Sequence, residues 1–143
     1  HVVNTASMAG HVCAPFSGPY QVSKFAAYGY SESLAHDLAA TGSTIGVSVL
    51  CPSLIATGIG TSSRNRPDDL PGTGGEDVEF VEGALVQMTT ELGLDPSVVA
   101  GQVLAAVRAG DFLIPTNDDY RSWIEGHAED LVERRLPRMV TYT

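Results

Sequence analysis

The sequence predicts an α/β fold, in which parallel strands are joined by helical crossovers. Short β-rich apolar segments alternate along the chain with longer segments of helical periodicity. Gly, Pro or Asp bounds these segments where strands and helices usually start and stop. Small polar residues follow two of the strands directly, at the sheet edge where α/β proteins bind their ligands.

The first half of the chain is expected to form a strand, a loop, a long helix and a second strand. The helix has apolar faces separated by alanines, and Thr41-Gly42 supplies its C-terminal stop. Val- and Leu-rich residues form the second strand until Pro52 stops it. The expected elements are strand 1–5, loop 8–18, helix 19–40 and strand 45–51.

The second half begins with a long polar segment that is dense in Gly, Ser, Pro, Asn and Asp. Loops of this length in compact domains are usually functional lids or poorly ordered. Asp95 followed by Pro96 indicates an N-cap and the first helical position, and Gly110 a C-terminal stop. The expected elements are loop 57–75, helix 78–91, helix 95–109, strand 112–115 and helix 118–136.

The composition favours one globular domain that binds neither nucleic acid nor a membrane. The 143 residues suffice for a sizeable core, and a net charge of −9 does not suit phosphate contacts. No apolar run approaches the ~20 residues that span a bilayer. Cys13 and Cys51 form no metal or redox motif, and the four histidines are scattered, so we expect no metal site. A reducing, cytoplasmic setting is therefore expected.

Lys24 is the only lysine, whereas the other seven basic residues are arginines. It follows Tyr20 by four residues, so on a helix both side chains share one face about one turn apart. An arginine would serve as a solvated surface charge, so a lone lysine indicates a need for a compact ammonium.

Three segments together resemble the classical short-chain dehydrogenase/reductase family. They are Asn-Thr-Ala-Ser at 4–7, Tyr-Gln-Val-Ser-Lys at 20–24 and Cys-Pro-Ser-Leu-Ile-Ala-Thr at 51–57. The resemblance implies a Rossmann-like, doubly wound parallel sheet of which residues 1–143 are only the C-terminal half. The N-terminal, dinucleotide-binding half of that domain is not present in the sequence. An apolar start without Met also suggests a missing N-terminal part.

The resemblance implies catalytic roles for Ser7, Tyr20 and Lys24 in the interconversion of a secondary alcohol and a ketone. A free tyrosine has a pKa of ~10 and is a poor base at neutral pH. An adjacent ammonium favours the phenolate and lowers that pKa. Tyr20 would be the general acid/base. Ser7 would hydrogen-bond the substrate oxygen, and Lys24 would also bind the ribose hydroxyls of the cofactor.

The same resemblance implies cofactor binding and self-association. Tyr20 and Lys24 would contact NAD or NADP, and the segment after the second strand would hold its carboxamide. The substrate would be a small molecule, and the protein a homodimer or homotetramer. The expected cofactor-binding residues of that segment are Pro52, Ser53, Ile55 and Thr57.

The sequence departs from the family pattern in several places. The Gly-rich turn that binds the pyrophosphate, the residue that selects NAD or NADP, and the upstream asparagine all lie outside these residues. Asn4 is too close to Ser7 to be that asparagine. Ser53 stands where the family usually has glycine. The chain by itself is therefore expected not to bind a dinucleotide, and neither the substrate nor the choice of cofactor can be predicted.

Other interpretations of these residues stay open. Ser7 is compatible with a strand end that satisfies a local backbone donor, and Thr57 with an ordinary turn. Tyr20 and Lys24 are compatible with an exposed helix pair. At the level of the protein, the alternatives are a non-catalytic scaffold that kept the fold and an inactive half-domain fragment. Such a fragment would expose an unpaired sheet edge and associate with other chains.

Overall fold

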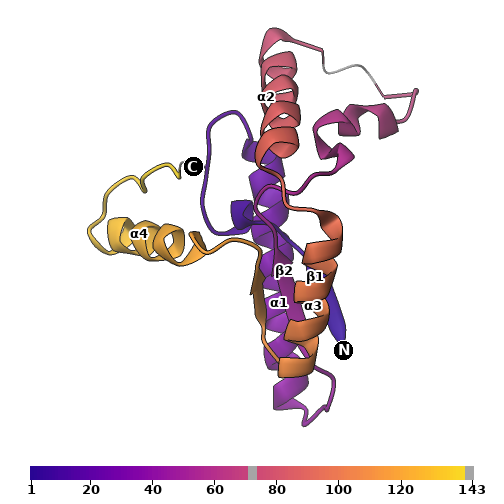
Figure 1. Ribbon diagram of the computed structural model, residues 1–143. Helices are drawn as coiled ribbons and strands as arrows, with labels where there is room; N and C mark the ends of the chain where they lie inside the picture. The colour runs from indigo at the N-terminus through magenta and orange to yellow at the C-terminus, as the bar shows by residue number, and fades with distance from the viewer. Residues whose placement is uncertain (71–73, 141–143) are drawn as a thin grey trace. The chain divides into compact units, whose positions relative to one another are not determined.

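A computed structural model describes residues 1–70 and 74–140, and this part of the chain contains a three-stranded parallel sheet (Figure 1). Its strands, in spatial order, are β1 (Val2–Thr5), β2 (Val47–Cys51) and β3 (Leu113–Pro115). The central strand β2 pairs with both neighbours, and Val49 is the partner of Asn4 in one ladder and of Leu113 in the other. The parallel α/β sheet predicted from the sequence is confirmed.

The helices alternate with the strands as expected. None of the helices among the described residues combines the length and apolarity needed to cross a bilayer. The helices are α1 (Gly18–Ala40), α2 (Glu76–Leu92), α3 (Pro96–Ala109) and α4 (Tyr120–Val132), with the 3-10 helices η1 (Met8–Gly10) and η2 (Gly58–Asn65).

The chain divides into two units, each described by itself. The first comprises residues 1–53 and 101–143 and contains the sheet together with α1 and α4. The second comprises residues 54–100, in which η2 contacts α2. A short parallel bridge between Ile55 and Leu94 closes the second unit.

Helix α1 lies against β1 and β2 through a stripe of residues three or four positions apart. Pro19 lies in its first turn, where its missing N–H costs nothing. Within the stripe, Gln21 and Ser31 are buried and each is hydrogen-bonded. The Ser31 hydroxyl accepts from Asn4 Nδ2 at 3.0 Å, so a polar contact fixes α1 to β1.

The core lies beside the carboxyl ends of the strands. It consists of residues that are at most 1% exposed, namely Ala6, Met8, Val49 and Cys51. Full burial of a Val or Met side chain contributes about 1.5–3 kcal/mol, so these few residues fix where both adjoining strands end. Partly buried residues of α1, α4 and the β3 region surround them: Ala27, Tyr28, Phe112, Leu113, Tyr120, Trp123 and Ile124.

Two expected loops contain short helices. Ser7 caps η1, because its hydroxyl accepts from the amide of Ala9. In η2, one Nη1 of Arg64 donates to the carbonyls of Gly58 and Thr61, both at 2.7 Å, and so replaces part of the backbone hydrogen bonding. Of the polar loop expected at 57–75, residues 71–73 lie outside the described residues.

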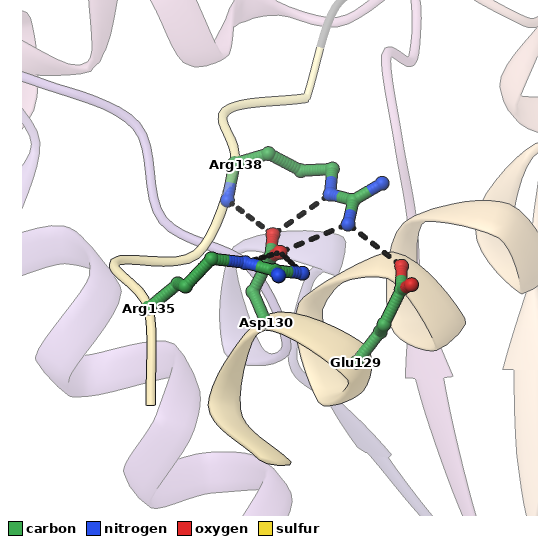
Figure 2. Close-up of polar contacts among 4 residues, drawn as sticks. All are labelled: Glu129, Asp130, Arg135 and Arg138. Carbon is green, nitrogen blue, oxygen red and sulfur yellow. Dashed lines mark hydrogen bonds and ion pairs between the residues drawn. The ribbon is translucent and has the colours of Figure 1, made fainter. Parts of the chain in front are cut away.

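The last helix is shorter than the expected 118–136. It ends at Val132, and Arg134 adopts a positive φ of 58°, which a helix cannot continue through. The buried carboxylate of Asp130 then holds the following segment against α4 (Figure 2). It accepts from Arg135 Nη2 at 3.0 Å and from the Arg138 amide and Nε at 2.9 and 2.7 Å.

The arginines fix the charge state of this carboxylate. Hydrogen bonds from the Arg138 side chain, and then from its backbone, hold the pKa of Asp130 well below its usual range. Glu129 adds a second acceptor for Arg138 Nη2 at 2.7 Å. The charge-assisted contacts therefore persist in mildly acidic solution.

A polar cluster lies beside the core, where the residues after β1 meet α1. His11 contacts the ring of Tyr28 edge-on, with centroids 4.2 Å apart, and its Nε2 lies 3.5 Å from Cys51 Sγ. Burial lowers the pKa of His11; the carboxylate of Glu32 opposes this shift, and His127 adds to it. The imidazole is therefore neutral at physiological pH.

We predict that Asp130→Asn releases residues 134–140. Asparagine keeps the shape but loses the charge that both arginines contact, so limited trypsin digestion should cleave after Arg135 severalfold faster than in the wild type. Glu129→Gln is the matched control, because it removes one exposed partner of Arg138 only. Equal cleavage rates in the two variants would contradict this account.

We also predict that His11→Gln flattens the acid dependence of stability. With a lowered pKa in the folded state, the unfolded chain binds a proton first, so stability falls as the pH drops below about 6.5. Between about pH 7.5 and 5.5, the denaturation midpoint of the wild type should fall more steeply than that of the variant. His36→Gln, at an exposed position, should keep the wild-type slope. An unchanged slope in His11→Gln would show that His11 does not carry the effect.

Candidate active site

The carboxyl ends of the three strands are tied together by the residues that follow them. Ser7 lies two residues after β1, Pro52 directly after β2, and Thr116 directly after β3. Ser7 Oγ donates to the carbonyl of Pro52 at 3.4 Å, and the Ser53 amide donates to Thr116 Oγ1 at 3.0 Å. Because the strands are parallel, all three ends lie at the edge where α/β sheets bind ligands.

The Ser7 hydroxyl is buried but only weakly held by its own bonds. It accepts from the Ala9 amide at 3.1 Å, and the bond that it donates to Pro52 is long for an O–H···O contact. Its hydrogen can therefore be redirected to the oxygen of a bound molecule at small cost. The position of Ser7 Oγ itself depends on the backbone of the turn that carries Ser7.

Tyr20 and Lys24 lie on one face of the first turns of α1. Lys24 Nζ is 5.5 Å from the centroid of the Tyr20 ring and donates to the Thr5 carbonyl at 3.4 Å. The ammonium thus connects the tyrosine to the end of β1. Tyr20 is 41% exposed, so its ring remains accessible from solution.

Gly10 lets the turn after Ser7 approach α1 closely. A Cβ at this position would lie 2.8 Å from the Lys24 carbonyl oxygen, which is closer than real side chains come. The turn that begins at Ser7 and the helix that carries Lys24 are therefore packed backbone to backbone. Any residue other than glycine would separate them.

The rest of the connection between η1 and α1 is more exposed. It is held to α1 at Ala14, whose carbonyl accepts from Nε2 of the buried Gln21 at 2.8 Å. Phe16 has a φ of 61° and is 74% exposed. This non-glycine residue at positive φ is unusual, and it places an aromatic ring on the surface between Ser7 and Tyr20 in the sequence.

The structure brings five of the predicted site residues into the first unit: Ser7, Tyr20, Lys24, Pro52 and Ser53. Ile55 and Thr57 belong to the second unit. There, Thr57 Oγ1 donates to the Ile55 carbonyl at 3.4 Å, and the Ala56 amide donates to the Leu94 carbonyl at 2.9 Å.

Several residues that shape the site were not singled out from the sequence. Thr116 was detectable in principle, because it follows a predicted strand at the same sheet edge as Ser7. Gly10, His11 and Cys51 were not, because their roles arise from contacts with distant parts of the chain.

Burial shapes the chemistry of the sulfur next to the site. Cys51 is completely buried, and burial raises the pKa of its thiol to about 11, although the Ser7 amide and the charge of Lys24 act against the shift. It is therefore a protonated thiol at neutral pH. Among the described residues, no group of three or more His, Cys, Asp or Glu side chains is placed to hold a metal ion.

The chain matches the family model described as short chain dehydrogenase over residues 1–68. It is 51% identical over 59 residues to estradiol 17-beta-dehydrogenase 11 of Rattus norvegicus, a match that covers 41% of this chain and 20% of that protein. It is 27% identical over 140 residues to the CLA biosynthesis dehydrogenase/reductase of Lactiplantibacillus plantarum, covering 95% of this chain and 49% of that protein. The chain thus spans about half the length of this bacterial relative.

A solved structure matches the whole chain. It is a short chain dehydrogenase/reductase from Burkholderia phymatum in complex with NAD, with a TM-score of 0.92 and 30% sequence identity. The match covers 100% of this chain and 52% of that protein. The fold, the family model and the relatives agree, and the chain belongs to the classical short-chain dehydrogenase/reductase family.

Proposed function

We propose that this chain is the C-terminal catalytic half of a single Rossmann-type domain that interconverts a secondary alcohol and a ketone with NAD or NADP. The observation that carries the proposal is the position of Lys24, whose Nζ lies over the Tyr20 ring and donates to the carbonyl of Thr5, two residues before Ser7. A likeness to a dehydrogenase that was solved with NAD supports a nicotinamide cofactor. The dinucleotide-binding half of the domain would lie outside these 143 residues.

The donors at this edge suit the nicotinamide end of such a cofactor. Lys24 Nζ and the Tyr20 hydroxyl are hydrogen-bond donors for ribose hydroxyls, and the carbonyls of Pro52 and Ser53 are acceptors. Ile55 and Thr57 are proposed as cofactor-binding residues because they match the family motif. When bound, the cofactor supplies the hydride acceptor or donor.

The side chains of this chain would handle the proton and the substrate oxygen. Ser7 would turn its hydroxyl hydrogen from the Pro52 carbonyl to the substrate oxygen and orient it. Tyr20 would give its phenolic proton to that oxygen during reduction and take it back during oxidation. Lys24 places a positive charge beside the ring, where negative charge develops as the phenol loses its proton.

The relatives suggest which substrates to try first. The name of the rat relative specifies estradiol, so steroid alcohols and ketones head the series, followed by acyl-chain and aromatic ketones. Free cysteines agree with a reducing, cytoplasmic setting. We include in the proposal a homodimer or homotetramer as the working form.

Tyr20→Phe tests the proposal in the protein expressed from its complete coding sequence. Loss of the phenolic proton should lower kcat by roughly 10²–10⁴-fold, while the cofactor still binds. The assay follows nicotinamide absorbance with the substrate series, and cofactor binding is measured by fluorescence. Tyr30→Phe is the matched control, because Tyr30 is an exposed tyrosine on the same helix. Full turnover in Tyr20→Phe would refute the role proposed for this tyrosine, whereas a wild type that turned over no substrate of the series would favour a scaffold.

Ser7→Ala tests the second group. We expect kcat to fall about 10²–10³-fold, as when one donor to a reacting oxygen is removed. Ser7→Thr keeps the hydroxyl and should retain most of the activity. Ser122→Ala, at an exposed position on α4, controls for the substitution itself. If Ser7→Ala and Ser122→Ala had equal kcat values, Ser7 would be only the cap of η1.

A further inference from the structure

One thiol contacts the far end of the turn that carries Ser7. Cys51 is the last residue of β2 and is completely buried. Its sulfur lies 3.5 Å from Nε2 of His11. Between Ser7 and His11 the chain makes the single turn η1, closed by bonds from the Gly10 amide to the Ser7 carbonyl and from the His11 amide to the Met8 carbonyl.

The thiol can donate a hydrogen bond to the imidazole. The sulfur is protonated at neutral pH, so its hydrogen is available to Nε2 of His11. That arrangement requires a neutral imidazole with its hydrogen on Nδ1. Burial of His11 favours the neutral form.

The imidazole also fixes the turn to α1. It packs edge-on against Tyr28, with the ring planes at 67°, and Tyr28 forms a side-chain hydrogen bond with Glu32. One residue earlier, Gly10 meets the backbone of Lys24. Cys51 and His11 thus link the end of β2, the Ser7 turn and α1.

The Ser7 hydroxyl needs such support, because its own contacts are weak. Its bond to Pro52 is 3.4 Å long and would be given up when a ligand oxygen arrives. From then on, only the backbone of the turn holds the hydroxyl oxygen in place. Misplacement of a reacting group by about 1 Å can cost about 10²-fold in rate.

We propose that Cys51 and His11 are positioning residues for Ser7, the thiol holding the imidazole and the imidazole anchoring the far end of the turn that carries Ser7. The inference rests on the catalytic role proposed for Ser7. It assigns to the residue before Pro52 a task that is separate from core packing.

The test compares Cys51→Ala with Val49→Ala in the protein expressed from its complete coding sequence. Both shorten a fully buried residue of the same strand, but of the two only Cys51 contacts His11 at the end of the Ser7 turn. In Cys51→Ala, kcat should fall about tenfold with the KM for cofactor within about twofold, and Val49→Ala should lose stability while keeping kcat within about twofold. Cys51→Ser restores an acceptor and a donor, and should recover most of kcat. Equal kcat losses in the two alanine variants would overturn the inference.

His11 is tested in the same way with a surface control. His11→Gln should lower kcat severalfold with an unchanged KM for cofactor, and His36→Gln should change neither. If His11→Gln lowered thermal stability alone, the imidazole would be a packing residue and its part of the inference would fall.

Amide hydrogen exchange, measured by NMR, gives a readout that does not need turnover. The Gly10 and His11 amides, which close the turn, should exchange about tenfold faster in Cys51→Ala than in the wild type, whereas the Ala6 amide, which donates to the Leu50 carbonyl, should not change. If the wild type turned over no substrate, the function proposed above would fail, and exchange at Gly10 and His11 would still decide this inference. Unchanged exchange at both amides would overturn it even in an active enzyme.

Discussion

The backbone of β2 hydrogen-bonds to β1 on one side and to β3 on the other, and the groups of the candidate site are positioned from the place where β2 ends. The carbonyl of Pro52, the first residue beyond this strand, accepts from the Met8 amide at 3.0 Å and from the Ser7 hydroxyl. The next amide, that of Ser53, reaches across to Thr116. The end of one central strand therefore sets the relative positions of segments more than forty residues apart.

The site combines two kinds of support that differ in strength. Tyr20 and Lys24 lie on the 23-residue helix α1, which is rigid because its buried stripe packs against the sheet. Ser7 rides on a single short turn, which has little stability of its own. The contacts made by Gly10, His11 and Cys51 make this turn rigid, as packing against the sheet does for the helix.

Most of the fold could be predicted because it depends on local patterns. Periodicity, prolines and glycines placed each strand and α-helix, and the Asp95 cap is present, with its carboxylate accepting from the Ser97 amide at 2.7 Å. The end of α4 could not be predicted, because Asp130 contacts arginines five and eight residues later across a bend. The motif residues of the first unit were identified by their spacing within one family. The contact between the His11 imidazole and the Cys51 sulfur could not be predicted, because the two residues are forty positions apart and no local pattern links them.

The close approach of Gly10 to α1 also bears on how this protein could change during evolution. Residues 7–11 and the start of α1 must vary together, because a side chain at position 10 would displace the helix that carries Lys24. The neighbouring residues 13–16 are exposed, and the ring of Phe16 projects into solvent. Replacements within 13–16 can therefore change this exposed segment without moving Ser7, Tyr20 or Lys24. One connection between a strand and a helix thus holds both a sterically constrained half and a half that is free to vary.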